Sequence, residues 1–264
     1  MDRIALPGGV ELIIDGVRRS AEVWLRRPEV RNAQTMATWA SLARAAEIIG
    51  EHPDLSAVVL RGTGKDFSAG LDLRMLHGSG PAGEGDLREL LTSGDAEVRR
   101  AIAGFQRGFS CWRELPAIVV AVVTGHAIGA GFQLALAADL RILSDDAVLV
   151  MAEARLGLVP DLGGTRKLVE IVGYARALEI CATAGPLDAV RAEQLGLANA
   201  VIRRDDLASG VERFLGTLRA VDPLVSRSIK ALMVSAASST PTGQLEAERN
   251  AQVPLLRRVT ASSG

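Results

Sequence analysis

Lysine and cysteine are both scarce in this chain of 264 residues. Three lysines stand against 27 arginines, so we expect any phosphate-bearing ligand to meet arginine. The formal net charge of −1 provides no basic field for nucleic acid or for an anionic membrane surface. Cys111 and Cys181 belong to no C-x-x-C pattern, which is typical of reduced, buried thiols in a cytoplasmic protein. Cysteine and the three histidines show no metal-ligand spacing, so we expect no metal.

The sequence also shows neither the pattern of a signal peptide nor that of a membrane-spanning helix. Residues 1–12 carry two acids and no apolar core segment, so we expect no signal peptide. The most apolar window, residues 115–140, is interrupted by glycine, proline, His126 and Gln133, and its β-branched residues gather at one end. We interpret this window as a buried strand that leads into a helix.

Strand and helix patterns alternate through the first 200 residues, and only helical patterns follow. This order predicts an α/β fold with parallel strands, a core over residues 1–200 and a helical region over 201–264. The segment 78–94 is rich in glycine and acids and is predicted as a mobile surface segment. The predicted strands are a hairpin within 10–28, then 56–62, 117–123 and a pair at 140–144 and 147–153, and the predicted helices are 35–53, 95–115 and 165–173.

Two similar glycine bends each follow a β-branched strand. SAGLDL at 68–73 and GAGFQL at 129–134 share a small-Gly-apolar pattern, and two such units packed side by side would bring the bends together. Two backbone N–H groups aimed at one point form an oxyanion hole. The sequence fits a dinucleotide-binding turn less well. Leu134 stands where the motif G-x-G-x-x-G requires its third glycine. Asp145 is only roughly at the position of the acid that binds the ribose hydroxyl. We interpret His126 as a packed turn residue.

Five stretches in order resemble the enoyl-CoA hydratase/isomerase (crotonase) superfamily: LRRPEVRNAQT (25–35), VVLRGTGKDFSAGLDL (58–73), PAIVVAVVTGHAIGAGFQLALAADLRI (116–142), EARLGLVPDLGGTRKL (153–168) and AEQLGLANAVI (192–202). The resemblance implies a crotonase-type spiral of ββα turns with a C-terminal helical trimerisation region, assembled as a homotrimer or a dimer of trimers. It also implies an acyl-CoA substrate, with coenzyme A bound as part of that substrate and no separate cofactor.

The resemblance carries specific roles onto these positions. It implies that the backbone N–H groups of Leu71 and Ala130 form the oxyanion hole. Asp72 is expected chiefly to cap the following helix, and Arg27 is the first candidate to meet the adenosine phosphates. The substrate-binding positions implied in the same stretches are Arg27, Glu29, Arg31, Ala69, Asp72, Leu73, Gly129 and Gly131.

The candidate proton-transfer groups differ from those of the best-known hydratases of the family. Where those enzymes hold a water between two glutamates, this chain has Gln133 and Glu153. Glutamine can orient a water but cannot take its proton. Asp161 stands eight residues after Glu153, at a position where isomerases of the family carry an acid. We therefore expect double-bond isomerisation slightly ahead of hydration.

Three alternatives remain open at this point. Glu153 and Gln133 would serve hydration, and the same oxyanion hole would serve thioester hydrolysis or decarboxylation. A protein that only binds acyl-CoA is the third reading, although the presence of both Glu153 and Asp161 speaks against it. In any of these readings the acid-rich segment 78–94 is a candidate cover for the acyl pocket.

Overall fold

The computed structural model describes residues 1–84 and 86–261 and contains a main sheet of seven strands, in the order β1-β2-β3-β4-β5-β7-β10. The first three strands are antiparallel, and the remaining neighbours run parallel. This mixed sheet confirms the predicted α/β class. The strands are β1 (Asp2–Leu6), β2 (Val10–Asp15), β3 (Ser20–Leu25), β4 (Ala57–Gly62), β5 (Ile118–Val123), β7 (Leu140–Ser144) and β10 (Ala200–Ile202).

A second sheet of three short strands corrects two sequence expectations. It consists of β6 (His126–Ile128), β8 (Val148–Val150) and β9 (Leu187–Asp188). A strand, β6, therefore lies immediately before the second glycine bend, where the sequence pattern did not predict one. The strands expected as a pair at 140–144 and 147–153 lie in different sheets, because a tight turn after Ser144 redirects the chain and β8 pairs with β6.

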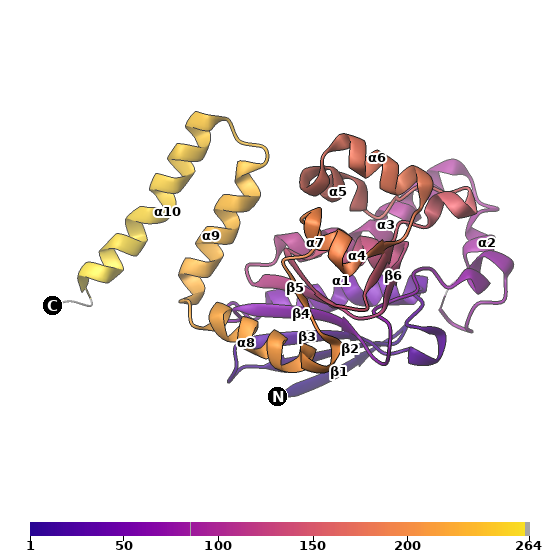
Figure 1. Ribbon diagram of the computed structural model, residues 1–264, viewed down its shortest axis with the longest axis horizontal. Coiled ribbons are helices and arrows are strands. Elements are labelled where there is room, and N and C mark those ends of the chain that lie inside the picture. Colours follow the sequence, from indigo (N-terminus) through magenta and orange to yellow (C-terminus); the bar gives the residue numbers. More distant parts are fainter. Residues whose placement is uncertain (85, 262–264) are drawn as a thin grey trace.

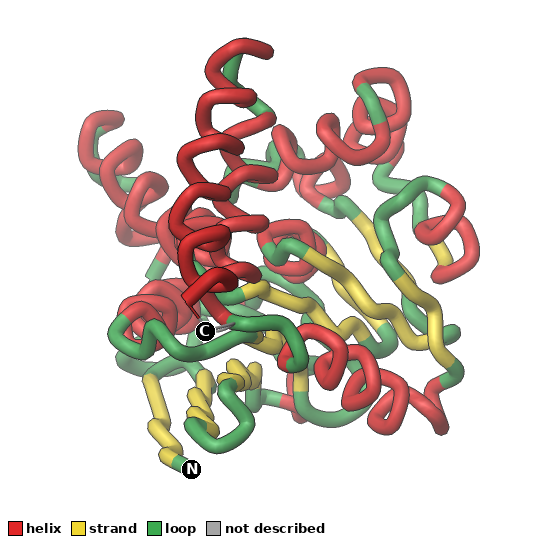
Figure 2. Tube along the Cα trace, turned by 90° about the vertical axis from the view of Figure 1, so that its left-hand side faces the viewer, coloured by secondary structure: helices red, strands yellow, loops and turns green. Residues whose placement is uncertain are grey.

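The two faces of the main sheet have separate apolar layers. Alternate residues of β4 and β5 point to opposite faces, as a strand requires. Val58 packs into the large cluster with α1 (Met36–Gly50) and α3 (Asp95–Glu114), whereas Val59 packs against α8 (Leu207–Arg219). Figure 2 shows helices on both sides of the strands. Burying one such aliphatic side chain stabilises the fold by about 1.5–3 kcal/mol.

The helices agree with the predicted segments, with differences at the bends. Helix α1 begins where expected because Thr35 caps it in a reciprocal capping box with Thr38. The helix expected after the first bend is a short 3₁₀ helix, Leu73–His77. Segment 78–94 contains α2, and Gly85 lies outside the described residues. The remaining helices of the body are α2 (Leu87–Leu90), α4 (Ala130–Ala137), α5 (Gly164–Val172), α6 (Tyr174–Thr183) and α7 (Ala189–Gln194).

Helices α9 (Pro223–Ala236) and α10 (Pro241–Ala261) form an antiparallel pair that stands to one side of the body, as Figure 1 shows. Lys230 fixes α9 to the body. Its Nζ lies 2.7 Å from Asp139 Oδ2 and donates to the carbonyl oxygen of Ala117 at 2.9 Å. The expected helical region extends to residue 264, and its last three residues lie outside the described part. Within the described ranges, no helix is both long enough and apolar enough to cross a membrane.

Candidate active site

The two glycine bends lie side by side, as their repeated pattern predicts. Ser68 N donates to His126 O at 2.9 Å, and Ile128 N donates to Ser68 O at 3.0 Å. Gly70 makes the close approach possible. Its φ is +82°, and a Cβ at this position would lie 2.3 Å from Ile128 O and 3.3 Å from Ala130 N. Only glycine fits this contact without a backbone shift.

Two backbone N–H groups at this junction have no acceptor within the described part of the protein. One belongs to Leu71, which follows Gly70, and the other to Ala130, the first residue of α4. An N–H in the first turn of a helix has no partner inside the helix, and the helix dipole places positive charge there. Both residues line one cavity of about 480 Å³. The two residues with open N–H groups therefore border the same space.

A buried polar network holds the first bend in position. Trp39 Nε1 donates to Gln34 Oε1 at 2.9 Å, and Gln34 Nε2 donates to Ser68 Oγ at 3.0 Å. Ser68 Oγ in turn accepts from Gly70 N at 3.1 Å. We did not identify Gln34, Ser68 or Trp39 from the sequence, because nothing in the local pattern links residues of three separate segments. Their bonds fix the conformation that leaves the Leu71 N–H open.

The cavity beside the donors is mainly aliphatic. Of the positions implied by the resemblance, Ala69, Leu73 and Gly129 line it together with Leu71 and Ala130. Gly131 does not line it. A Cβ on Gly131 would lie 2.5 Å from Ser68 O, so this glycine serves the packing of α4 against the first bend. The other lining residues are Trp39, Ile102, Ile128, Gln133, Ala152, Glu153, Arg155, Leu156, Leu158, Val159, Asp161 and Leu162.

Gln133 occupies a structural position between Glu153 and the loop that carries Asp161. Its Nε2 donates to Glu153 Oε1 at 2.6 Å. Its Oε1 accepts from the backbone N–H groups of Leu162 at 3.0 Å and Gly164 at 3.2 Å. An amide oxygen has two lone pairs, so both acceptor sites of Gln133 are used. Gln133 therefore holds the carboxylate and the loop in one fixed arrangement.

Glu153 and Asp161 supply the two carboxyl groups of the cavity. Glu153 is 9% exposed, and its Oε2 has no hydrogen-bond partner in the described part of the chain. Burial raises the pKa of Glu153; the hydrogen bond from Gln133 opposes this rise and the charge of Asp161 adds to it. Asp161 is exposed, and partial desolvation by its surroundings raises its pKa as well. Raised pKa values make both groups better suited to exchange protons near neutral pH.

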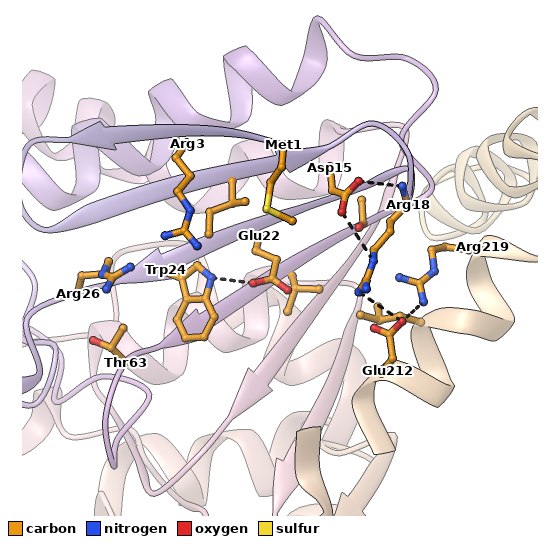
Figure 3. A pocket seen from close by; sticks show the side chains of 14 residues that line it. Met1, Arg3, Asp15, Arg18, Glu22, Trp24, Arg26, Thr63, Glu212 and Arg219 are labelled. Atoms are coloured by element: carbon orange, nitrogen blue, oxygen red, sulfur yellow. Dashed lines mark hydrogen bonds and ion pairs between the residues drawn. The ribbon is translucent and has the colours of Figure 1, made fainter. Parts of the chain in front are cut away.

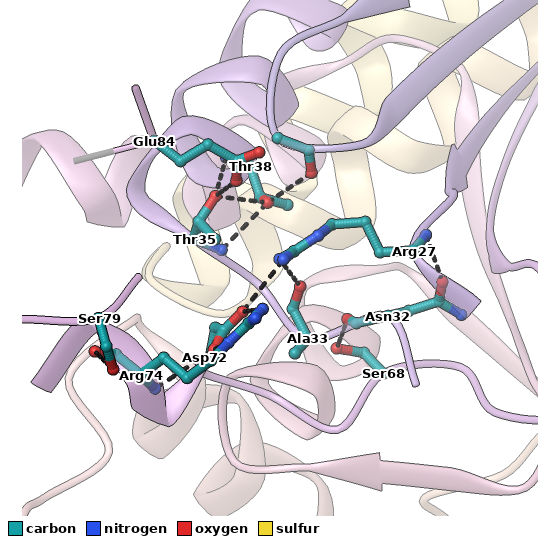
Figure 4. A network of polar contacts seen from close by, with 11 residues as sticks. Arg27, Asn32, Ala33, Thr35, Thr38, Ser68, Asp72, Arg74, Ser79 and Glu84 are labelled. Atoms are coloured by element: carbon teal, nitrogen blue, oxygen red, sulfur yellow. Dashed lines mark hydrogen bonds and ion pairs between the residues drawn. The ribbon is translucent and has the colours of Figure 1, made fainter. Parts of the chain in front are cut away.

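Helix α3 also lines the aliphatic cavity, which the sequence did not indicate. Ile102 lines the cavity, and one turn later Gln106 Nε2 donates to the backbone oxygen of Asp161 at 2.7 Å. This bond ties the loop of Asp161 to α3. None of the described residues of segment 78–94 lines the cavity, so the expected cover is not in place over it. Instead, Glu84 Oε2 accepts from Thr35 Oγ1 at 2.7 Å, at the start of α1 (Figure 4).

Arg27 and Asp72 form a buried ion pair beside the first bend (Figure 4). Arg27 NH2 lies 3.1 Å from Asp72 Oδ2, with side-chain exposures of 12% and 4%, and Arg27 NH1 donates to Ala33 O at 2.7 Å. Asp72 also accepts from the N–H of Arg74 and caps the 3₁₀ helix, as expected. The hydrogen bonds from Arg74 and Arg27 lower the pKa of Asp72 to about 2, against the opposing effect of burial.

Arg31 and Glu29 lie at the surface next to this pair. Glu29 is exposed in the 3₁₀ helix Pro28–Val30. Arg31 Nε donates to Asp66 Oδ2 at 2.8 Å, and His126 Nδ1 lies 2.8 Å from Asp66 Oδ1. Arg31, Asp66 and His126 line a separate hollow, and His126 is not among the described residues that line the aliphatic cavity.

A further hollow of about 280 Å³ lies on the outer face of the N-terminal strands, near α8 (Figure 3). Several of its charged groups form hydrogen bonds or ion pairs. Trp24 Nε1 donates to Glu22 Oε2 at 2.7 Å, and Arg18 lies 3.7 Å from both Asp15 and Glu212. Arg18 thereby connects Asp15 at the end of β2 with Glu212 of α8.

The comparison with known families agrees with the geometry. A sequence model described as "Enoyl-CoA hydratase/isomerase" matches residues 18–260. The chain therefore belongs to the enoyl-CoA hydratase/isomerase, or crotonase, superfamily, and it is an enzyme of that class with an acyl-CoA substrate.

Curated relatives include both kinds of activity. The protein named "Probable enoyl-CoA hydratase echA8" of Mycobacterium leprae is 30% identical over 241 residues, which cover 90% of this chain and 86% of the relative. The peroxisomal Delta(3,5)-Delta(2,4)-dienoyl-CoA isomerase of Arabidopsis thaliana is 31% identical over 212 residues, which cover 80% of this chain and 75% of the relative. The names alone do not separate hydration from isomerisation.

Solved structures share the whole fold, including the C-terminal helices. A Thermobifida fusca YX protein in complex with acetoacetyl-CoA is 42% identical, with a TM-score of 0.88 and coverage of 95% of this chain and 96% of that chain. A Thermobifida fusca YX protein in complex with CoA aligns with a TM-score of 0.87 at 41% identity, with coverage of 96% of this chain and 95% of that chain. The mixed sheets and terminal helices are thus those of crotonase structures.

Proposed function

We propose that this enzyme moves a carbon–carbon double bond along the acyl chain of an enoyl-CoA or dienoyl-CoA thioester. The thioester oxygen would accept hydrogen bonds from the N–H groups of Leu71 and Ala130. As a proton leaves the acyl chain, negative charge develops on this oxygen, and each preorganised donor stabilises it by about 3 kcal/mol. The aliphatic cavity would hold the acyl chain next to Glu153 and Asp161.

The bonding of Gln133 is the observation that carries this proposal. A hydratase needs a second group that holds and activates a water together with Glu153. Both acceptor sites of Gln133 are bound to backbone N–H groups, and one of its N–H groups is bound to Glu153. Gln133 therefore supports the position of Glu153 and is poorly placed to activate water.

Two carboxyl groups with raised pKa values suit proton transfer between two carbons. One carboxylate takes a proton from one end of the allylic unit, and the electron pair moves onto the thioester oxygen as a conjugated enolate forms. A carboxylic acid then returns a proton at the other end of the unit, and the electron pair moves back. No water enters the balance. The isomerase of Arabidopsis thaliana among the relatives supports this reading.

Coenzyme A would bind across the edge of the first bend. Arg27 is held by Asp72 and Ala33 and is nearly buried, whereas Arg31 is exposed. We therefore favour Arg31 over Arg27 as the residue that meets a phosphate of the adenosine part.

Hydration is the second candidate, because relatives such as the mycobacterial protein carry that name. A panel of trans-2-enoyl, trans-3-enoyl and 3,5-dienoyl-CoA esters, assayed for both hydration and double-bond migration, separates the two. We expect kcat/KM for migration to exceed that for hydration by at least about tenfold. Faster hydration across the panel would overturn the proposal in favour of a hydratase, and binding without either turnover would reduce the protein to an acyl-CoA binder.

A further inference from the structure

A second cavity, of about 460 Å³, shares a wall with the acyl pocket. Gln133 and Leu162 line both spaces, so their side chains separate the two. We call this second space the rear cavity. It is bounded by the end of α3, by α4, by the first turn of α5 and by the end of α9 near Val234.

The rear cavity has an excess of positive charge. Its lining contains Arg113, Arg166 and Lys167 but only one carboxylate, that of Glu114. Outside the lining, Glu170 serves both arginines, at 3.2 Å from Arg113 NH1 and 2.9 Å from Arg166 Nε. The cavity therefore presents more cations than the neighbouring acids can pair.

Lys167 is the cation without a pair. It is half-buried, and within residues 1–84 and 86–261 it has neither a hydrogen-bond partner nor an ion-pair partner. Burial is the main cause that lowers the pKa of Lys167, and the positive charges of Arg141 and Arg113 lower it further. The negative charges of Asp139 and Glu170 act in the opposite direction. An ammonium group in such surroundings gains more from an anion than an exposed one does.

The remaining wall of the rear cavity is apolar. Ala137 and Val234 are half-buried and give the cavity accessible apolar surface, and the core residues Phe109, Leu136 and Leu162 complete the lining at no more than 4% exposure. A strongly hydrated inorganic anion would lose its water here without compensation from these side chains. A ligand that combines an anionic head with an aliphatic tail satisfies both parts of the lining.

We propose that the rear cavity binds a free aliphatic carboxylate, with its head at Lys167 and its chain against Ala137 and Val234. We expect this ligand to stay out of the acyl pocket, because three hydrogen bonds hold Gln133 between the two cavities. The site is thus separate from the thioester site and does not depend on which reaction that site performs.

Calorimetric titration of the full-length protein with sodium octanoate tests the site. We expect one octanoate per chain, and we expect Lys167→Met to weaken binding at least tenfold while Lys167→Arg retains most of it. Arg100→Met removes an exposed cation of α3 outside the cavity and should leave Kd unchanged. Octanol and inorganic phosphate should each bind at least tenfold more weakly than octanoate.

Two results would overturn the proposal. The first is equal affinity of the wild type and Lys167→Met for octanoate, or equal affinity of the wild type for phosphate. The second is loss of octanoate binding in the presence of saturating acetoacetyl-CoA, which would place octanoate in the acyl pocket. Because the titration needs no turnover, it gives an answer even where the proposed isomerisation fails.

Discussion

Gln133 Nε2 lies 2.6 Å from Glu153 Oε1 and donates a hydrogen bond to it, while Gln133 Oε1 accepts two backbone N–H groups from residues 162 and 164. An amide is suited to this position because it can donate on one side and accept on the other. A carboxylate at residue 133 could still accept the two N–H groups, but it would meet Glu153 with like charge.

This relationship predicts the effect of Gln133→Glu on the pH profile. Two carboxyl groups at hydrogen-bond distance share a proton, which raises the apparent pKa of the pair. The acid limb of kcat/KM should therefore move to higher pH, because Glu153 must be ionised to act as a base. A profile identical to that of the wild type would show that residue 133 does not control Glu153.

Replacing Glu153 is expected to increase stability while it lowers activity. Burial raises the pKa of Glu153 in the folded state, so its ionised form weakens folding above that pKa, and the penalty disappears as pH falls below the unfolded value. Glu153→Gln keeps the shape and the contact with Gln133 but removes the charge. At pH 7 we expect Tm to rise by about 2–4 °C for each kcal/mol by which the free energy of unfolding increases. Calorimetric scans should show this gain shrinking toward about pH 4, near the ordinary pKa of glutamate. A Glu153→Gln protein that is less stable at pH 7 would contradict the stated cause of the pKa shift.

Gly70→Ala tests the approach of the two bends. A Cβ at residue 70 meets Ile128 O at 2.3 Å, so the bends must separate and the two N–H groups can no longer face one point. We expect kcat to fall by about 10² or more. Gly173→Ala is the matched control. Gly173 has a similar φ of +77° with nothing within 4 Å of a Cβ, so this change adds backbone strain without the clash. Equal losses in the two variants would mean that strain alone explains the effect.

The C-terminal helices predict an oligomer. Ile229 and Met233 lie one turn apart on α9 and are 50% and 64% exposed, an apolar face of the kind that partner chains cover. Light scattering should give three or six times the chain mass of 27.8 kDa. Met233→Glu should shift the distribution to smaller species. Val17→Glu, at a position 96% exposed in the turn between β2 and β3, should not. A wild-type mass near 27.8 kDa at micromolar concentration would contradict trimerisation.

Sequence patterns predicted most of the helices and strands, because these elements depend on residues close together in the sequence. Continuous apolar runs with β-branched residues identify β4 and β5, and an amphipathic helical pattern identifies α1. The three residues of β6 are too few to show a period, so the strand just before the second bend escaped prediction. Its partner β8 was identified but placed in the wrong sheet, because pairing between distant segments leaves no trace in either one.

The candidate site residues and their roles stay predictions, because each was proposed from its own stretch of sequence. Leu71 and Ala130 line one cavity, and their N–H groups have no acceptor within the described residues. The role of Gln133 depends on partners 20 to 31 residues away, and no sequence pattern shows that its oxygen is occupied. The sequence also did not show that Lys167 lacks an ion-pair partner among the described residues. The nearby carboxylate of Glu170 pairs with Arg113, which belongs to another helix.

The kcat of Asp161→Asn for double-bond migration tests the central claim most directly. In an isomerase one carboxyl group removes a proton and another returns it, so loss of Asp161 should lower kcat by about two to four powers of ten. Its backbone oxygen still accepts from Gln106, so the loop should keep its position. A kcat for migration within about twofold of the wild type would contradict the two-carboxyl account, because Glu153 would then be sufficient by itself.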